Sequence, residues 1–369
     1  MALLRFIIPL LGAFIILVNP GTAVLDQHFV VPQPRPLPAA DTVTVRIIGD
    51  VMMHAGQLPY DYSTFLERIS GSLREADIAV ANMEFSLGGK PYAGYPCFSA
   101  PDSYVWTVAQ QCGVDLFLTA NNHILDRGTA GLKRTLDVYD KVRDSLGVLF
   151  TGTSRSRAEQ EANFPAVISR RGIRIAFVNF TYGTNSGTGG TGWPRVNMLE
   201  GAVVDSAFSR AKAQGADFIV AIPHWGNEYQ FHHSSAQQRW AERMVKDGAD
   251  VIVGGHPHIV QDTTHISGVP VIYSVGNAVS NMTVPKTRME LMVTLRFVRN
   301  NGTGEKTMLE PELDFMWCTL PGTLSDSFRT IFVNDYIGTR GNWHNPGDYD
   351  MMLHILDQVK SSTGIGGGA

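Results

Sequence analysis

The feature that most constrains this chain is a set of apolar, strand-like runs that each end in polar side chains able to bind a metal. The clearest is Leu116–Gly128, in which an apolar run leads into Asn122, His123 and Asp126. In open α/β sheets, ligands bind at the carboxyl ends of the strands. We therefore expect these polar residues to share one site at one edge of a sheet.

Hydrophobic periodicity predicts the elements of this sheet and of the helices that cover it. Strands alternating with helices indicate a layered α/β fold. The expected strands are Thr42–Ile48, Asp77–Ala81, Asp115–Ala120, Asp217–Ile222, Ala249–Val253 and Val269–Tyr273, with hairpins formed by Asn163–Arg170 with Ile173–Phe180 and by Arg288–Val298 with Lys306–Phe315. The expected helices are Ser63–Arg74, Ser103–Cys112, Gly131–Leu146, Gly201–Gln214, Ser235–Asp247 and Tyr349–Lys360.

The N-terminus has the pattern of a targeting segment. Arg5 precedes the apolar run Phe6–Val18, and Gly21-Thr22-Ala23 offers small residues at cleavage-like spacing. We expect a signal peptide over residues 1–23, with an uncleaved signal anchor as the alternative. A proline-rich linker over 24–41, a main domain over 42–320 and a C-terminal extension over 321–369 are expected to follow. The folded part should then be exported, to the periplasm or the extracellular space.

Charge and cysteine content exclude some functions and leave one question open. A formal net charge of −4 offers no basic footprint for a nucleic acid, so none is expected as a partner. In an oxidising compartment Cys97 and Cys112 can pair and leave Cys318 over. Three buried thiols are the alternative.

The donor atoms at the strand ends suit a metal site. Carboxylates, an amide oxygen and imidazoles form a mixed nitrogen and oxygen set that fits Zn, Mn, Fe or Ni. Each residue alone has an ordinary explanation, as a core histidine, a turn aspartate or a loop asparagine. Their repetition at successive strand ends favours the metal site. The residues concerned are Asp50, Glu84, Asn122, His123, His224, His256 and His258.

These residues also carry a resemblance. The order strand-Asp50, strand-Glu84, Asn122-His123, strand-His224 and His256-Pro257-His258 resembles the motifs of the calcineurin-like metallophosphoesterases. The motifs GDVMMH, ANMEFSL, TANNHILDRG, TYGTN, HWGNEY, GGHPHIVQD and YSVGN are similar to the CapA branch, the poly-γ-glutamate capsule biosynthesis proteins. The resemblance covers roughly residues 43–280. It implies a layered α/β, calcineurin-like metallophosphatase fold, with a central β-sandwich flanked by helices and a C-terminal β-hairpin and helix.

The resemblance implies a role for each residue at the site and two divalent metal ions, with Mn, Zn, Fe or Mg as the candidates. Asn122, His224 and His256 would hold one ion, Asp50 and His258 the other, and Glu84 would bridge them. His123 would face the substrate as an acid. The spacing alone suggests that Asp126 orients His123, and a helix N-cap is the alternative for Asp126.

The family motifs also indicate residues that line the site. Tyr182, Asn185, Glu228, Tyr229 and Asn277 are expected to contact substrate, and Trp225 is expected either to form a wall or to belong to the core. The stretch Tyr182–Trp193 is rich in Gly and Thr and should form a loop over the substrate without regular structure.

The implied function is the synthesis or export of a capsule polymer such as poly-γ-glutamate. The chain would be a metal-dependent hydrolase or transferase that uses a metal-activated hydroxide. The alternative is a non-catalytic component that binds polymer. An anionic envelope polymer or a phosphoester would be the substrate, and a membrane-bound capsule synthetase complex is the expected partner.

Three departures from the family pattern bear on this function. Met52 stands where the superfamily has a histidine, and His54, in an extended strand, would lie ~13 Å from Asp50, so it can reach the site only if the chain turns. The second metal position is then short of one ligand. Asn121 replaces a glycine, which asparagine can do because it tolerates a left-handed backbone. Ala278 replaces a phenylalanine and is expected to open a pocket wall.

Overall fold

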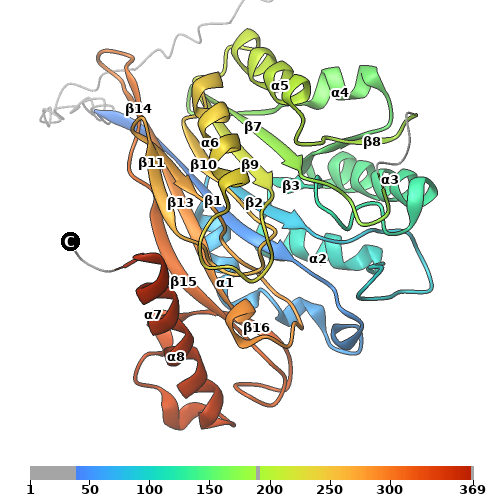
Figure 1. Cartoon of the computed structure of the whole chain (residues 1–369), viewed down its shortest axis with the longest axis vertical. Coiled ribbons are helices and arrows are strands. Elements are labelled where there is room, and N and C mark those ends of the chain that lie inside the picture. The colour runs from blue at the N-terminus through green and yellow to red at the C-terminus, as the bar shows by residue number, and fades with distance from the viewer. Residues whose placement is uncertain (1–38, 188–191, 367–369) are drawn as a thin grey trace, which may run out of the picture. The chain divides into compact units, whose positions relative to one another are not determined.

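The structure of the protein is a computed structural model that describes residues 39–187 and 192–366. The predicted signal segment and nearly all of the proline-rich linker lie outside these residues. Within them, the expected layered α/β architecture is confirmed: two mixed β-sheets pack face to face, with helices on their outer faces (Figure 1).

The first sheet supplies the earliest strand ends of the site. Its strands follow the order β16-β15-β13-β1-β2-β3-β4, and β14 also pairs with β13. Strands β1 to β4 run parallel, so that their carboxyl ends lie at one edge, whereas β13 lies antiparallel to β1. The bounds are β1 Ala40–Val51, β2 Ile78–Met83, β3 Leu116–Leu118, β4 Leu149–Thr151, β13 Met289–Asn300, β14 Lys306–Met308, β15 Glu312–Thr319 and β16 Arg329–Phe332.

The second sheet supplies the later strand ends. Its order is β11-β12-β10-β9-β7-β6, and its central strands β7, β9, β10 and β12 are parallel. The bounds are β6 Ala166–Arg170, β7 Ile173–Thr181, β9 Phe218–His224, β10 Val251–Val253, β11 Thr263–Ile266 and β12 Val269–Ile272. Strands β5 (Thr153–Ser154) and β8 (Arg195–Val196) form a separate, two-stranded antiparallel sheet.

Three apolar clusters hold the layers together. The central one joins side chains of both sheets, such as Val45 and Phe177. The second packs the first sheet against α1 (Glu67–Glu75), α2 (Asp102–Cys112) and α3 (Gly128–Leu146). The third packs the second sheet against α5 (Gly201–Ala213) and α6 (Ser235–Asp247). The strands read as nearly continuous apolar runs because both of their faces are covered.

The C-terminal part joins the same core. Helix α8 (Pro346–Thr363), which follows the short helix α7 (Val333–Tyr336), buries Met352 and Val359 in the central cluster. Arg288 and Asp348 form a buried ion pair, with Nη1 and Oδ1 2.6 Å apart, that fastens α8 beside β13 and β15 (Figure 1). The predicted tail helix Tyr349–Lys360 is confirmed within these longer bounds.

Several local predictions were wrong. The expected strand Asn163–Arg170 begins only at Ala166, because α4 (Arg157–Asn163) occupies its start. The expected strand Lys306–Phe315 divides into β14 and β15, although both pair antiparallel with β13 as the predicted hairpin required. The cysteines do not pair: Cys112 and Cys318 are buried thiols, and Cys97 is an exposed one.

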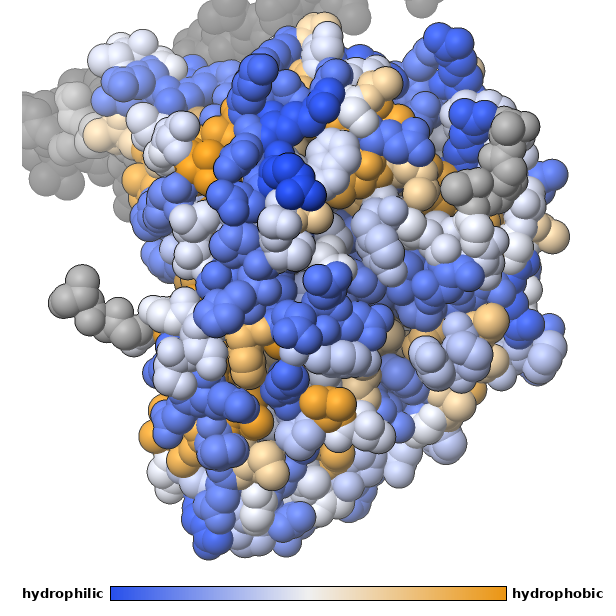
Figure 2. Space-filling view, viewed as in Figure 1, coloured by the Kyte–Doolittle hydropathy of each residue, from blue (hydrophilic) through white to orange (hydrophobic). Residues whose placement is uncertain are grey.

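The surface fits a folded globular protein. On the face that Figure 2 shows, hydrophobic side chains form separate areas between hydrophilic ones. Among residues 39–187 and 192–366, no helix combines the length and the apolar character that crossing a bilayer requires.

A buried carboxyl on β13, Glu290, provides a test of the core. It is fully buried, its oxygens have no hydrogen-bond partner among the described residues, and burial together with the charge of Asp50 raises its pKa well above the ordinary value. A raised folded-state pKa means that stability is lost as pH rises from the unfolded-state value through the folded-state value. Glu290→Gln should therefore raise the free energy of unfolding of the metal-free protein by about 1–3 kcal/mol at pH 8.

Urea unfolding in a chelator at pH 5 and pH 8 measures this effect, with exposed Glu305→Gln as the matched control. The gain should be larger at pH 8. A gain that is equal at both pH values would show that ionisation of Glu290 is not its cause.

Candidate metal centre

The six predicted metal ligands converge at the carboxyl edge of the two sheets. Strands β1 and β2 deliver Asp50 and Glu84, the turn after β3 delivers Asn122, β9 ends in His224, and the turn after β10 carries His256 and His258. His224 lies at the centre of the group: its Nε2 is 2.8 Å from Asn122 Oδ1 and 3.5 Å from Glu84 Oε1, and its Nδ1 is 3.9 Å from Asp50 Oδ1. Residues far apart in sequence thus form one site.

Glu84, His256 and His258 form the most compact set of donors. One ligand atom of each lies within 4.8 Å of the others, and all three side chains are buried. Neither oxygen of Glu84 has a hydrogen-bond partner among the described residues, and neither has His256 Nδ1. Buried polar groups are normally paired, and leaving one unpaired costs about 1–3 kcal/mol. These residues therefore fit a metal ion, for which each of them offers one ligand atom.

The backbone is strained where it presents the histidines. His256 and His258 have φ values of 96° and 59°, in the region that side chains other than glycine rarely adopt. Gly255 lies so close to Asp50 that an added Cβ would stand 3.1 Å from Oδ1. Strain of this kind costs roughly 1–3 kcal/mol per residue and is characteristic of functional sites.

The ionisable side chains of the site shift one another's pKa values. Burial alone would raise the pKa of Asp50, but hydrogen bonding to His258 and the charges of His224 and His258 lower it below its ordinary value. Burial would lower the pKa of His258, but Glu84, Asp50 and Asn277 raise it to about 9. Burial and the neighbouring imidazoles lower the pKa of His256 well below its ordinary value. His256 is therefore neutral at pH 7, the form in which histidine binds a metal.

His123 and Asp126 form a pair beside these donors. His123 Nδ1 lies 2.6 Å from Asp126 Oδ2, and the same oxygen accepts a hydrogen bond of 2.7 Å from the backbone N–H of Phe98. The ring of Phe98 packs edge-on against His123, with centroids 4.5 Å apart. Asp126 thus orients His123 as the spacing suggested. It is not a helix N-cap, because α3 begins at Gly128 and Arg127 occupies its N-cap position.

Sequence reasoning missed two amides of the site. Asn82 Nδ2 donates to Asp50 Oδ1 at 2.6 Å, and Asn121 Nδ2 donates to Asn82 Oδ1 at 3.2 Å. Asn121 Oδ1 also accepts from the backbone N–H of His123 at 3.2 Å. Both amides adjoin the predicted ligands in the motifs ANM and ANNH, and this adjacency was the available signal.

Four of the predicted substrate-contacting residues lie around the mouth of the site. The ring of Tyr182 packs on His256 at 4.5 Å between centroids, and that of Tyr229 lies 6.4 Å from His258. Asn185 contacts the His123–Asp126 pair, and its Nδ2 lies 3.4 Å from each ring nitrogen of His123. Glu228 is exposed, and its hydrogen bond and charge, after burial, raise the pKa of Tyr229 to about 12. Residues 182–187 have no helix or strand, as predicted.

Other predicted contacts are placed elsewhere. Trp225 is 1% exposed in the cluster between the second sheet and its helices, and its Nε1 donates to the backbone oxygen of Tyr273. It therefore belongs to the core. Ala278 and Met52 are also buried, in the cluster beneath the first sheet. Ala278 thus opens no pocket wall, and Met52 is no substitute for the missing histidine.

Asn277 lies behind His258 and does not face the mouth. Its Oδ1 accepts from His258 Nδ1 at 2.8 Å, and its amide nitrogen donates to the backbone oxygen of Thr287 at 3.0 Å. His258 Nδ1 also lies 3.6 Å from Asp50 Oδ2 and 3.9 Å from Glu84 Oε2, so Asn277 holds the ring beside both carboxylates. Because partners that orient a ligand are worth about 10–100-fold in metal affinity, Asn277→Ala should weaken metal binding by that factor. Titration calorimetry with Zn²⁺ or Mn²⁺ measures it, and an unchanged affinity would show that Asn277 does not orient the ligand.

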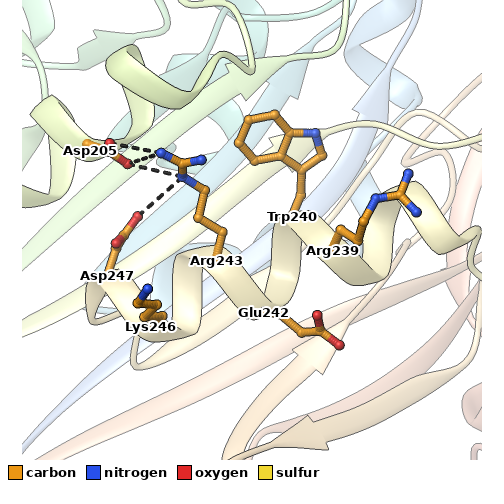
Figure 3. A pocket seen from close by; sticks show the side chains of 7 residues that line it. All are labelled: Asp205, Arg239, Trp240, Glu242, Arg243, Lys246 and Asp247. Carbon is orange, nitrogen blue, oxygen red and sulfur yellow. Dashed lines mark hydrogen bonds and ion pairs between the residues drawn. The ribbon is translucent and has the colours of Figure 1, made fainter.

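A second hollow lies away from this centre, on the outer face of α5 and α6 (Figure 3). Arg243 points toward Asp205 and pairs with it at 2.7 Å, and it also lies 3.9 Å from Asp247. Arg243, Asp205 and Asp247 therefore interact with one another at the surface, and among the described residues the only group of three candidate metal donors lies at the metal centre.

The sequence is similar to capsule proteins. A family model described as bacterial capsule synthesis protein PGA_cap matches residues 44–282. The PGA biosynthesis protein CapA of Bacillus subtilis (strain 168) is 33% identical over 187 residues, which are 50% of this chain and 47% of that protein. The capsule biosynthesis protein CapA of Bacillus anthracis is 28% identical over 281 residues, which are 71% of this chain and 66% of that protein. The matched part thus spans less than two thirds of either relative.

Solved structures with a similar arrangement include phosphoesterases. A calcineurin-like phosphoesterase, YfkN from Bacillus subtilis, has a TM-score of 0.47 at 13% identity and covers 87% of this chain and 100% of that one. A 5'-nucleotidase precursor from Thermus thermophilus has a TM-score of 0.48 at 15% identity and covers 87% of this chain and 59% of that one.

Proposed function

Because the chain belongs to the bacterial capsule synthesis protein PGA_cap family, we propose that it acts in making an envelope polymer such as poly-γ-glutamate, as a metal-dependent hydrolase or transferase. The observation that carries this proposal is the buried Glu84 beside His256 and His258, neither of whose oxygens has a hydrogen-bond partner among the described residues. We further propose two divalent cations, with Mn, Zn, Fe or Mg as candidates: Asn122, His224 and His256 at one position, Asp50 and His258 at the other, and Glu84 between them.

The remaining residues supply the protein's own part of the chemistry. Cations bound there would polarise the attacked group and lower the pKa of a coordinated water toward ~7. When water attacks phosphorus in a phosphoester, the bond to the leaving oxygen breaks and that oxygen needs a proton. His123, held by Asp126 at 2.6 Å, is placed to donate it. Tyr182 and Asn185 would cover the substrate once it is bound.

The setting of this activity is also part of the proposal. We propose that the chain is exported by its N-terminal segment and works in the periplasm or outside the cell, either free or anchored to the membrane. An anionic polymer or a phosphoester is the proposed substrate, and a capsule synthetase in the membrane is the proposed partner.

Metal-dependent hydrolysis of bis(p-nitrophenyl) phosphate by the purified chain tests the proposal. Activity should disappear in a chelator, return with Mn²⁺ or Zn²⁺, and be lost in Glu84→Gln. Equal activity in the wild type and in this variant would contradict the assignment of the site.

One observation favours a second candidate, a non-catalytic component that binds polymer through the same site. Met52 packs in the core, so the position beside Asp50 lacks a ligand that the superfamily has. Full metal loading without hydrolysis of any phosphoester or γ-glutamyl amide would support this candidate.

A further inference from the structure

His54 adjoins the His123–Asp126 pair through the ring of Phe98, and it belongs neither to the proposed metal ligands nor to that pair. Strand β1 ends at Val51 and a 3-10 helix begins at Ala55, so the chain turns at His54 instead of continuing away from Asp50. The ring of His54 packs edge-on against Phe98 at 5.0 Å, and Phe98 packs edge-on against His123 at 4.5 Å. Phe98 therefore contacts both imidazoles.

Nε2 of His54 is buried and has no hydrogen-bond partner among the described residues. A buried, unpaired imidazole nitrogen is costly, and in a native structure it points to a ligand group or an ion that would pair with it. The compact donor set of Glu84, His256 and His258 does not include His54. The hydrogen-bond partner of His54 Nε2 is therefore expected to belong to a ligand that binds beside the metal ions.

The surroundings keep His54 in place and uncharged. Burial, followed by electrostatic interaction with His258 and His123, lowers its pKa to about 4. Its backbone N–H donates to Gln57 Oε1 at 2.8 Å, and Gly94 packs so tightly against its backbone that an added Cβ would lie 3.0 Å from the Cα of His54. A neutral imidazole on a fixed backbone offers one N–H donor.

We propose that His54 is a substrate-binding residue whose Nε2–H donates to an oxygen of a tetrahedral, anionic phosphoryl group bound at the metal centre. The inference rests on the proposed function, because it takes the metal centre as the place where that group binds. His54 would hold one oxygen of the group, while His123, on the other side of Phe98, protonates the leaving oxygen. His54 would thus supply a contact near the position where Met52 leaves the site without a histidine.

Binding of inorganic phosphate to the metal-loaded full chain tests this contact, with bound metal measured in the same samples. His54→Ala should weaken phosphate binding about tenfold, the worth of one hydrogen bond to a charged group, and should leave the metal content unchanged. His54→Gln, which keeps an N–H donor near the Nε2 position, should restore part of the affinity. His265→Ala is the control, because His265 is an exposed histidine on β11 that pairs with Glu310 at 2.9 Å.

The steady-state constants add a second readout. If His54 holds the phosphoryl group before and during reaction, His54→Ala should raise KM for a phosphodiester more than it lowers kcat. Unchanged phosphate affinity and KM in a folded, metal-loaded His54→Ala would overturn the inference and leave the proposed hydrolase intact. Loss of metal in both variants would overturn it too, because His54 would then be a ligand. A wild type that loads metal but binds no phosphate and hydrolyses no phosphodiester would overturn the hydrolase proposal as well, so the two failures are distinguishable.

Discussion

Replacing Glu84 with glutamine is expected to lower the affinity for divalent cations by roughly 10²–10³-fold, since a binding free energy of about 10–16 kcal/mol shared among four ligands corresponds to about 3–4 kcal/mol for each. Glutamine keeps the size of the side chain, but it removes the negative charge and turns one acceptor into a donor. Neither oxygen of Glu84 has a hydrogen-bond partner among the described residues, and the imidazoles of His224 and His258 that lie 3.5 Å and 3.9 Å from them are themselves proposed ligands. The loss should therefore appear in metal binding before it appears in folding.

Metal content after dialysis against buffered Zn²⁺ or Mn²⁺, together with calorimetric titration, measures this effect. Exposed Glu305→Gln is the matched control and should bind metal like the wild type. His256→Asn is a useful companion variant, because asparagine tolerates the positive φ of 96° better than alanine does. Wild-type metal affinity in both Glu84→Gln and His256→Asn would contradict the assignment of a metal centre to this edge of the sheets.

His123→Ala should lower kcat for phosphodiester hydrolysis by about 10²–10⁴-fold, the usual contribution of a positioned general acid. Metal binding should stay near the wild-type level, because His123 stands apart from the compact donor set and pairs with Asp126 instead. Asp126→Asn should reproduce part of the loss, since it removes the carboxylate that orients the imidazole.

Comparing two leaving groups tests whether His123 acts as a general acid. A p-nitrophenolate group leaves without much help from a proton, whereas an alkoxide needs one, so the loss of kcat should be larger for an alkyl diester than for a p-nitrophenyl diester. Equal losses for the two substrates would indicate that His123 binds or positions the substrate and does not protonate it. Loss of metal in His123→Ala would assign it to the ligand set.

Much of this site was predictable because the signals are local. An apolar run that ends in Asp50, Glu84 or His224 marks a strand end, and parallel strands bring their ends to one edge whatever the details of packing. The acid pair was also local, since His123 and Asp126 lie three residues apart and meet within one turn.

Local signals failed where one sequence pattern fits two structures. The apolar end of Asn163–Arg170 fits a strand, but its start belongs to α4, whose N-cap at Ser156 lies outside the predicted segment. The break between β14 and β15 contains Pro311, which cannot donate to a strand ladder, so the prediction of one continuous strand gave this local signal too little weight.

The sequence alone determined the layered α/β class, the family and the donors that gather at the strand ends, because periodicity and motif order need no knowledge of distant contacts. Only the tertiary structure decided which way the neighbouring side chains face. It placed Trp225 in the core and Asn277 against His258, and it left His54 Nε2 and both Glu290 oxygens buried without hydrogen-bond partners among the described residues. The physical reason is that a side chain's direction depends on which distant segment fills the space beside it, and residues adjacent in a strand point to opposite faces.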